Sequence, residues 1–159
     1  RTIKGWSYNK KKSFQRWSFY EKPQCQGRAY SQFRPLPDFS QSNCLPVDEF
    51  RSATKSNIKI EGDCVLFFTK SCYAGDEFKI CSNKAEIKEE EFDTSKINSI
   101  FSSWDLAIDI KNSLVFYEKK NFEGKACGIK TKRYLNMLDF DKSTLDCIRK
   151  AKSISITKA

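Results

Sequence analysis

The stretch VFYEKKNFEG, residues 115–124, contains the pattern that decides the fold. The pattern is an aromatic residue, four further residues, a second aromatic, one residue and a glycine, at Tyr117, Phe122 and Gly124. The same positions are held upstream by Phe68, Tyr73 and Gly75, and earlier by Tyr20, Cys25 and Gly27. Since the leading aromatics are 48 and 49 residues apart, the sequence predicts three copies of one module.

A serine follows each glycine at a nearly constant distance. Ser56, Ser103 and Ser153 lie 29, 28 and 29 residues after the glycines. Each precedes alternating apolar residues, which are Ile58 and Ile60, Leu106 and Ile108, and Ile154 and Ile156. Alternation of period two predicts a half-buried strand, and the glycine permits the positive φ at which a hairpin folds over. A unit of about 45 residues buries too little surface to be stable alone, so we expect the modules to pair.

These features together resemble the βγ-crystallin superfamily over roughly residues 14–158. The resemblance is carried best by SFYEKPQCQGRAY, residues 18–30, and by residues 115–124. In addition, KSNIKIEGDCV, residues 55–65, is similar to the junction between the two motifs of one crystallin domain. The resemblance implies an all-β, Greek-key sandwich with three motifs.

The resemblance also implies a division of the chain. Residues 1–13 would form an N-terminal basic arm, and residues 14–108 a domain of two motifs, 14–62 and 63–109. Residues 110–159 would form a third, unpaired Greek-key motif. We expect that motif either to pair with its copy in a homodimer or to lack a partner domain. The opposite charges of the acidic middle module and the basic third module offer another docking route.

Seven cysteines without a close Cys-x-x-Cys pair, in a chain without histidine, disfavour a zinc site and indicate disulfides. Disulfides persist in oxidising compartments, so we predict a secreted, extracellular protein whose chain starts after a cleaved signal peptide or is a prepared segment. No apolar run approaches the ~18–20 residues that a membrane span needs. The positions of the cysteines within the modules favour the pairs Cys25–Cys44, Cys64–Cys81 and Cys127–Cys147. Cys72 is then an exposed thiol and a candidate bridge to another chain.

Calcium sites of the resembled family use a motif similar to Asn/Asp-Asn/Asp-x-x-Ser/Thr-Ser. The middle module keeps Asn98 and Ser102 at two of these positions, whereas Ser99 stands at the second. The other modules place Arg51 with Lys55, and Ile148 with Lys152, at the positions of Asn98 and Ser102. Because a lysine repels the cation and calcium needs six to eight oxygens, only a weak, degenerate half-site remains. We predict no cofactor, calcium included.

Catalysis is disfavoured by the same composition. Without histidine the chain cannot build a Ser-His-Asp or Cys-His arrangement. The acidic run EIKEEEF, residues 86–92, is interpreted as a solvated loop or short helix face. We therefore predict no catalytic residues and no enzyme activity.

The net charge of +9 is distributed unevenly: +8 over residues 1–60, −6 over 61–110 and +7 over 111–159. Basic residues interleaved with Trp6, Tyr8, Phe14 and Trp17 can engage polyanions, although such runs are commonly just solvated. No specific nucleic-acid motif is present. The candidate partner-binding residues are Lys10, Lys11, Lys12, Arg16, Lys130, Lys132, Arg133, Arg149, Lys150 and Lys152.

The resulting hypothesis is a secreted, non-enzymatic binding or effector protein. Its basic surfaces would engage a macromolecular partner, either a protein or an anionic glycan or lipid surface. One alternative is a structural, matrix or stress-protection protein, as in the eye lens. Another is a protein similar to protease inhibitors or toxins, and fold alone does not choose among these functions.

Overall fold

The computed structural model describes residues 11–34, 44, 50–61, 63–103, 113–130, 134–137 and 140–157. This part of the chain is mostly β, as the sequence predicts, with a single α-helix. The strands are β1 (Lys11–Lys22), β2 (Gln26–Arg34), β3 (Ser52–Glu61), β4 (Val65–Lys70), β5 (Ala74–Ile80), β6 (Ser99–Ser102), β7 (Leu114–Lys119), β8 (Glu123–Ile129), β9 (Tyr134–Asn136) and β10 (Ser153–Ile156). The helix is α2 (Lys142–Arg149), and two 3-10 turns are η3 (Ser71–Tyr73) and η4 (Thr94–Lys96).

The three repeats form three antiparallel sheets with one pairing scheme. In each repeat the first strand pairs with the second through a hairpin and with the last strand on its other edge. The sheet orders are β2-β1-β3, β5-β4-β6-β9 and β10-β7-β8. The repeat seen in the sequence is therefore a repeat of structure, with β9 as an addition to the middle sheet.

The turn at each hairpin has the same backbone conformation. Gly27, Gly75 and Gly124 have φ of 82–83°, the left-handed region that glycine adopts at low cost. The residue two positions earlier also has positive φ in every copy: Cys25, Tyr73 and Phe122. A Cβ at Gly75 would collide with the side chain of Thr69, so this turn needs glycine for space as well as for φ.

One serine hydroxyl closes each turn. Ser99 Oγ accepts a hydrogen bond from Tyr73 N at 2.9 Å and donates one to Lys70 O at 2.7 Å. Ser52 and Ser153 make the same two bonds to the first and third turns. The equal spacing in the sequence places Ser56 and Ser103 alongside Ser153, but the serines that close the first two turns lie four residues earlier, at Ser52 and Ser99.

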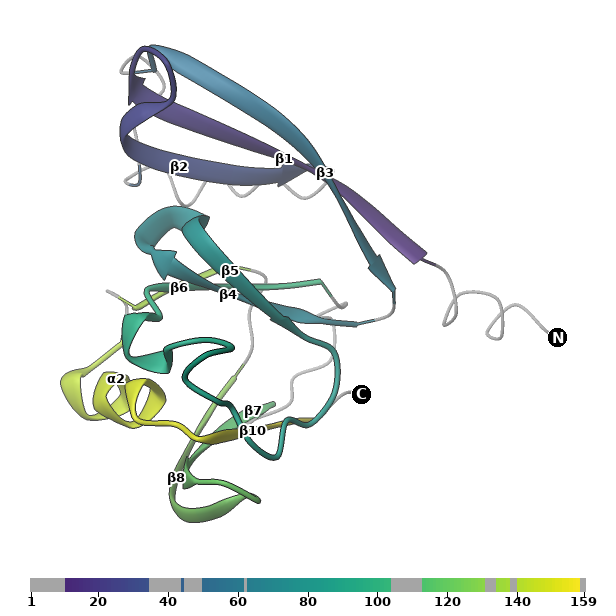
Figure 1. Cartoon of the computed structure of the whole chain (residues 1–159), viewed down its shortest axis with the longest axis vertical. Coiled ribbons are helices and arrows are strands. Elements are labelled where there is room, and N and C mark those ends of the chain that lie inside the picture. The colour runs from purple at the N-terminus through teal and green to yellow at the C-terminus, as the bar shows by residue number, and fades with distance from the viewer. Residues whose placement is uncertain are drawn as a thin grey trace, which may run out of the picture.

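The sheets are stacked in three layers, with β4 and its neighbours between the other two (Figure 1). Alternate residues of β4 face opposite layers, as the pleat requires. Val65 and Phe67 pack in a cluster with Leu114 and Phe116 of the third repeat. Leu66 and Phe68 pack in a second cluster with Phe14, Phe33 and Ile60 of the first repeat.

The third repeat packs against the middle repeat. Its β7 shares the larger core cluster with β4, and its β9 pairs with β6 through Ile100 and Leu135. Within residues 1–13, predicted as an N-terminal arm, Lys11 to Ser13 pair with β3. The remaining residues of that arm lie outside the described part.

Three disulfides are present. Cys64–Cys81 and Cys127–Cys147 confirm two predicted pairs. The third bond joins Cys44 to Cys72, so the predictions that Cys44 pairs with Cys25 and that Cys72 is a free thiol were wrong. The free thiol is Cys25, and its side chain is exposed. The sequence alone could not determine which cysteines pair, because Cys44 and Cys72 belong to different repeats.

Candidate functional site

The sheet β2-β1-β3 concentrates positive charge. Residues 11–34 and 50–61, which build this sheet and its turn, contain nine basic and two acidic residues, for a net charge of +7. Four of the basic side chains are exposed and take part in none of the ion pairs recorded among the described residues. These are Lys22, Arg34, Arg51 and Lys55.

Aromatic rings lie among these charges on one face of the sheet. Strand register places Lys55 opposite Trp17, and the Lys55 ammonium lies 5.5 Å from the ring centroid, in a cation–π arrangement. Trp17 and Phe19 are half-buried and stack at 6.3 Å. Arg34 falls on the same face, because it lies opposite Gln15, two residues from Trp17. We name Trp17, Phe19, Arg34 and Lys55 the basic-aromatic face.

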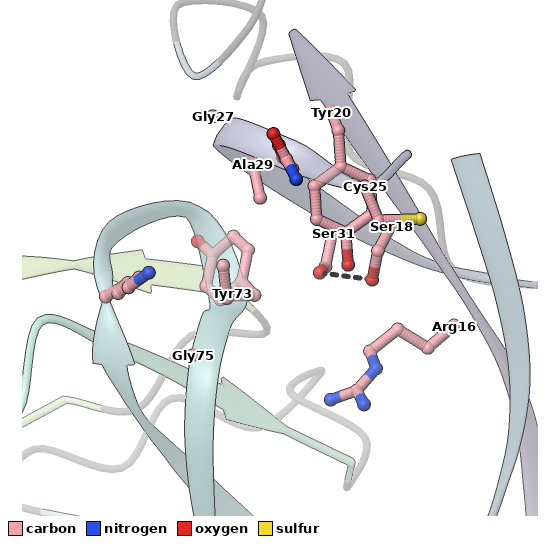
Figure 2. A pocket seen from close by; sticks show the side chains of 12 residues that line it. Arg16, Ser18, Tyr20, Cys25, Gly27, Ala29, Ser31, Tyr73 and Gly75 are labelled. Atoms are coloured by element: carbon pink, nitrogen blue, oxygen red, sulfur yellow. Dashed lines mark hydrogen bonds between the residues drawn. The ribbon is translucent and has the colours of Figure 1, made fainter. Parts of the chain in front are cut away.

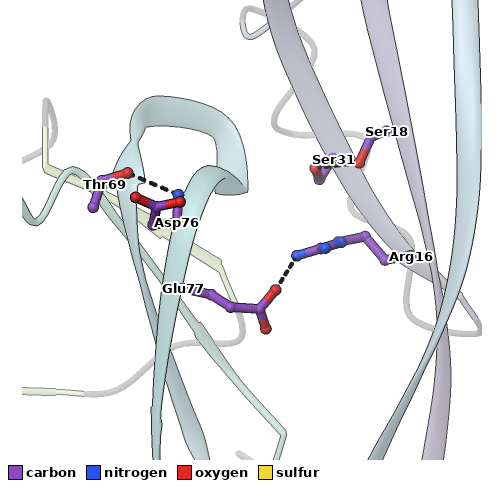
Figure 3. A network of polar contacts seen from close by, with 6 residues as sticks. All are labelled: Arg16, Ser18, Ser31, Thr69, Asp76 and Glu77. Carbon is purple, nitrogen blue, oxygen red and sulfur yellow. Dashed lines mark hydrogen bonds and ion pairs between the residues drawn. The ribbon is translucent and has the colours of Figure 1, made fainter. Parts of the chain in front are cut away.

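Arg16 points to the other side of this sheet. Its Nη1 lies 2.6 Å from Glu77 Oε1 of β5, and the ion pair joins the first layer to the second (Figure 3). In the same region a hydrogen bond of 3.0 Å links the hydroxyls of Ser18 on β1 and Ser31 on β2. On the second hairpin, Thr69 Oγ1 accepts a hydrogen bond from Asp76 N. Arg16, a predicted partner-binding residue, thus makes a contact between layers.

The structure describes only some of the other predicted basic residues. Lys10, Lys132 and Arg133 lie outside the described residues, and of Lys11 and Lys12 only the backbone in β1 is described. Lys130 is exposed after the end of β8, on a different sheet.

Arg149, Lys150 and Lys152 do lie together, in a groove of about 470 Å³ between α2 and the acidic segment before η4. Arg149 is engaged there, because its guanidinium donates to Ile97 O at 3.2 Å and to Asn98 Oδ1 at 2.8 Å. The groove is also lined by Glu89, Asp93 and Glu118, so it presents both signs of charge. Its charge is therefore less uniformly positive than that of the basic-aromatic face.

The acidic segment is solvated, in agreement with its interpretation. Glu89 and Glu90 are exposed, and Glu91 Oε2 accepts from Lys84 Nζ at 2.8 Å. That hydrogen bond is the main reason why the pKa of Glu91 is lowered. The pKa of Asp93 is lowered too, chiefly by the hydrogen bond from the Ser95 hydroxyl. Both carboxylates are thus held in their charged forms.

The residues of the predicted calcium half-site have other roles. Asn98 Nδ2 donates to Thr69 O, and its Oδ1 receives the cationic Arg149. Ser102 is completely buried in β6. Within the described residues no group of three His, Cys, Asp or Glu side chains could hold a metal ion.

A pocket of about 450 Å³ opens between the first two hairpins (Figure 2). Arg16, Ser18 and Tyr20 line it from β1, and Cys25 lines it from the first turn. Tyr73 lines it from the second hairpin. No pattern in the sequence indicates this pocket, because its two walls come from different repeats.

In comparisons with known proteins, no family model and no curated protein matches this chain. Among the described residues, no helix has the length and apolar character required to cross a membrane.

Proposed function

We propose that this chain is a secreted, non-enzymatic binding or effector protein with a βγ-crystallin-like, Greek-key scaffold. The three equivalent turns and sheets support the scaffold, and the three disulfides support an oxidising compartment. The partner is a macromolecule with an anionic surface, such as a sulfated glycan, a lipid membrane or an acidic protein.

The observation that carries the proposal is the basic-aromatic face. Lys55 and Arg34 lie beside Trp17 on a sheet with a net charge of +7. Charges arranged in this way attract a polyanion, and a half-buried aromatic ring adds apolar contact area. The proposed homodimer through Cys72 has lost its support, since that residue is disulfide-bonded.

Heparin chromatography and binding to anionic vesicles test the proposal over a salt series. The double variant Arg34→Glu, Lys55→Glu should bind heparin about five- to thirtyfold more weakly at low salt. The reason is that it reverses two surface charges, each of which contributes a modest binding free energy. The matched control is Lys79→Glu with Lys125→Glu, two exposed lysines of the other sheets. An equal loss in both variants would indicate binding by net charge alone. No binding of the unmodified protein to either polyanion would refute the anionic partner.

A further inference from the structure

The three hairpins differ at one side chain that their shared backbone makes directly comparable. Phe122 follows Tyr117 by five residues in the third turn, and their rings meet edge-on with centroids 5.7 Å apart. Tyr73 follows Phe68 in the second turn, again edge-on, at 6.2 Å. Such edge-to-face pairs are favourable arrangements of aromatic rings. Two of the three turns are therefore filled by a ring that packs on the leading aromatic.

The first turn has no such ring. Cys25 occupies the position of Tyr73 and Phe122, with the same positive φ and the same hydrogen bond from its N–H to a serine Oγ. Tyr20 keeps the position of the leading aromatic. The small, exposed Cys25 side chain leaves Tyr20 without the edge-on partner that the other two turns provide.

The space beside Tyr20 and Cys25 belongs to the pocket between the first two hairpins. Figure 2 shows Tyr20, Ser18 and Ser31 on the sheet side of this pocket and Tyr73 on the opposite hairpin. Its volume of about 450 Å³ lies within the range of small-molecule sites, roughly 300–1,000 Å³. The missing ring thus coincides with a cavity that can hold one.

The polar lining of the pocket favours an anion. Arg16 and Lys70 contribute to the lining, and no acidic side chain does so. Arg16 Nη1 forms an ion pair with Glu77. The buried Nε–H of Arg16, however, has no acceptor among the described residues. An acceptor brought by a ligand would satisfy that donor. Lys70 is exposed and provides a charge for a carboxylate at the rim.

We infer that this pocket is a binding site for a small aromatic carboxylate, whose ring takes the place that Tyr73 and Phe122 fill in the other turns. The ring packs against Tyr20, and the carboxylate faces Lys70 and Arg16. The site is separate from the basic-aromatic face, because Arg16 and Tyr20 lie on the opposite side of the same sheet. The inference does not depend on the proposed function.

Phenylacetate is a suitable probe, followed by amide chemical shifts in NMR titrations of the intact, oxidised protein. We expect saturable shifts at the first two hairpins.

Cys25→Phe supplies the missing ring and should weaken binding about tenfold or more, as expected when an anchor pocket is filled. Cys25→Ser keeps the space open and should bind within about twofold of the unmodified protein, well inside the factor of ten that 1.4 kcal/mol represents. Lys70→Met should weaken phenylacetate but leave neutral benzyl alcohol unchanged.

Chemical modification of Cys25 provides a second test, which remains decisive if Cys25→Phe fails to fold. Benzyl methanethiosulfonate converts the Cys25 thiol of the folded protein into a mixed disulfide that carries a benzylthio group and releases methanesulfinate. The methyl reagent adds only a methylthio group in the same way. The benzyl adduct should lose phenylacetate binding, and the methyl adduct should keep it, with mass spectrometry locating both adducts at Cys25. The inference is overturned if the unmodified protein shows no saturable shifts, or if the benzyl adduct binds as well as the methyl adduct. Equal binding of benzyl alcohol and phenylacetate would overturn the preference for an anion.

Discussion

At the scale of single residues, the serine hydroxyl of each turn supports the hairpin on two sides. Ser99 is completely buried, and its hydroxyl satisfies both an N–H and a carbonyl of the turn that contains Tyr73. A buried donor or acceptor that loses its partner costs about 1–3 kcal/mol, because water cannot replace the bond. The strained positive φ of Tyr73 makes this support more important, since a bulky residue rarely adopts it.

Replacing Ser99 by alanine should therefore lower the free energy of unfolding by about 1–3 kcal/mol, through the two unsatisfied backbone groups. Urea unfolding of the oxidised protein measures this loss. The control is Ser56→Ala, because Ser56 is exposed on β3, where surface changes stay within about 0.5 kcal/mol. Equal effects of the two substitutions would contradict the role of Ser99 in closing the turn.

The sequence predicts the glycines and aromatics of the turns correctly, but not their serines. Gly27, Gly75 and Gly124 are found because glycine is rare in this chain and tolerates the positive φ. The serines are ambiguous, because Ser56 and Ser103 recur at the same spacing as Ser153. In the third repeat α2 lies between the turn and its serine, which lengthens the interval and makes the wrong alignment look regular.

At the scale of elements, α2 is the part that an all-β pattern does not predict. Its start has a local cause: Asp141 Oδ1 accepts from Thr144 N at 2.9 Å, which satisfies one of the free N–H groups of the first turn. The helix buries Ile148 and is joined to β8 by Cys127–Cys147. The sequence signal for this helix start is Asp141-Lys-Ser-Thr, which the surrounding β alternation obscures.

The capping carboxylate gives the helix a pH dependence. Hydrogen bonds from the hydroxyl and then the backbone N–H of Thr144 lower the pKa of Asp141 below its ordinary value of 3.8. A carboxyl whose folded-state pKa is lowered stabilises the fold fully above its unfolded pKa, and the contribution is lost as pH falls through the folded pKa. The direction of the shift therefore predicts acid destabilisation below about pH 4.

Asp141→Asn keeps an N-cap acceptor but removes this titration. We expect the advantage of the unmodified protein over the variant to stay constant above about pH 5 and to shrink as pH falls from about 5 to about 2.5, across the range in which the carboxyl protonates. Thermal midpoints at each pH measure it. Asp146→Asn, an exposed change in the same helix, should show no such trend. A constant gap between the unmodified protein and Asp141→Asn would contradict the role of the Asp141 charge.

At the scale of the whole molecule, the middle sheet depends on both of its neighbours. The run Val65-Leu66-Phe67-Phe68 is apolar at every position, which is typical of a strand buried on both faces. This run was the sequence signal for three stacked layers. The family resemblance instead favoured a two-motif domain with a separate third motif. Covering only one face of β4 would leave two large side chains in water.

A fragment of residues 1–109 tests this dependence. Without the third repeat it would expose Val65, Phe67 and Ile100, all now completely buried, and would lose β9 from the edge of β6. Burial of each such side chain contributes about 1.5–3 kcal/mol, so the loss is comparable to the whole stability of a small domain, about 5–15 kcal/mol.

We expect the fragment to lack a cooperative unfolding transition in urea, whereas the full chain should unfold in one transition that near-ultraviolet circular dichroism and fluorescence report at the same urea concentration. If the fragment is monomeric and unfolds as sharply as the full chain, the first two repeats form a complete domain by themselves. The third layer would then be an attachment, and not a part of the common core.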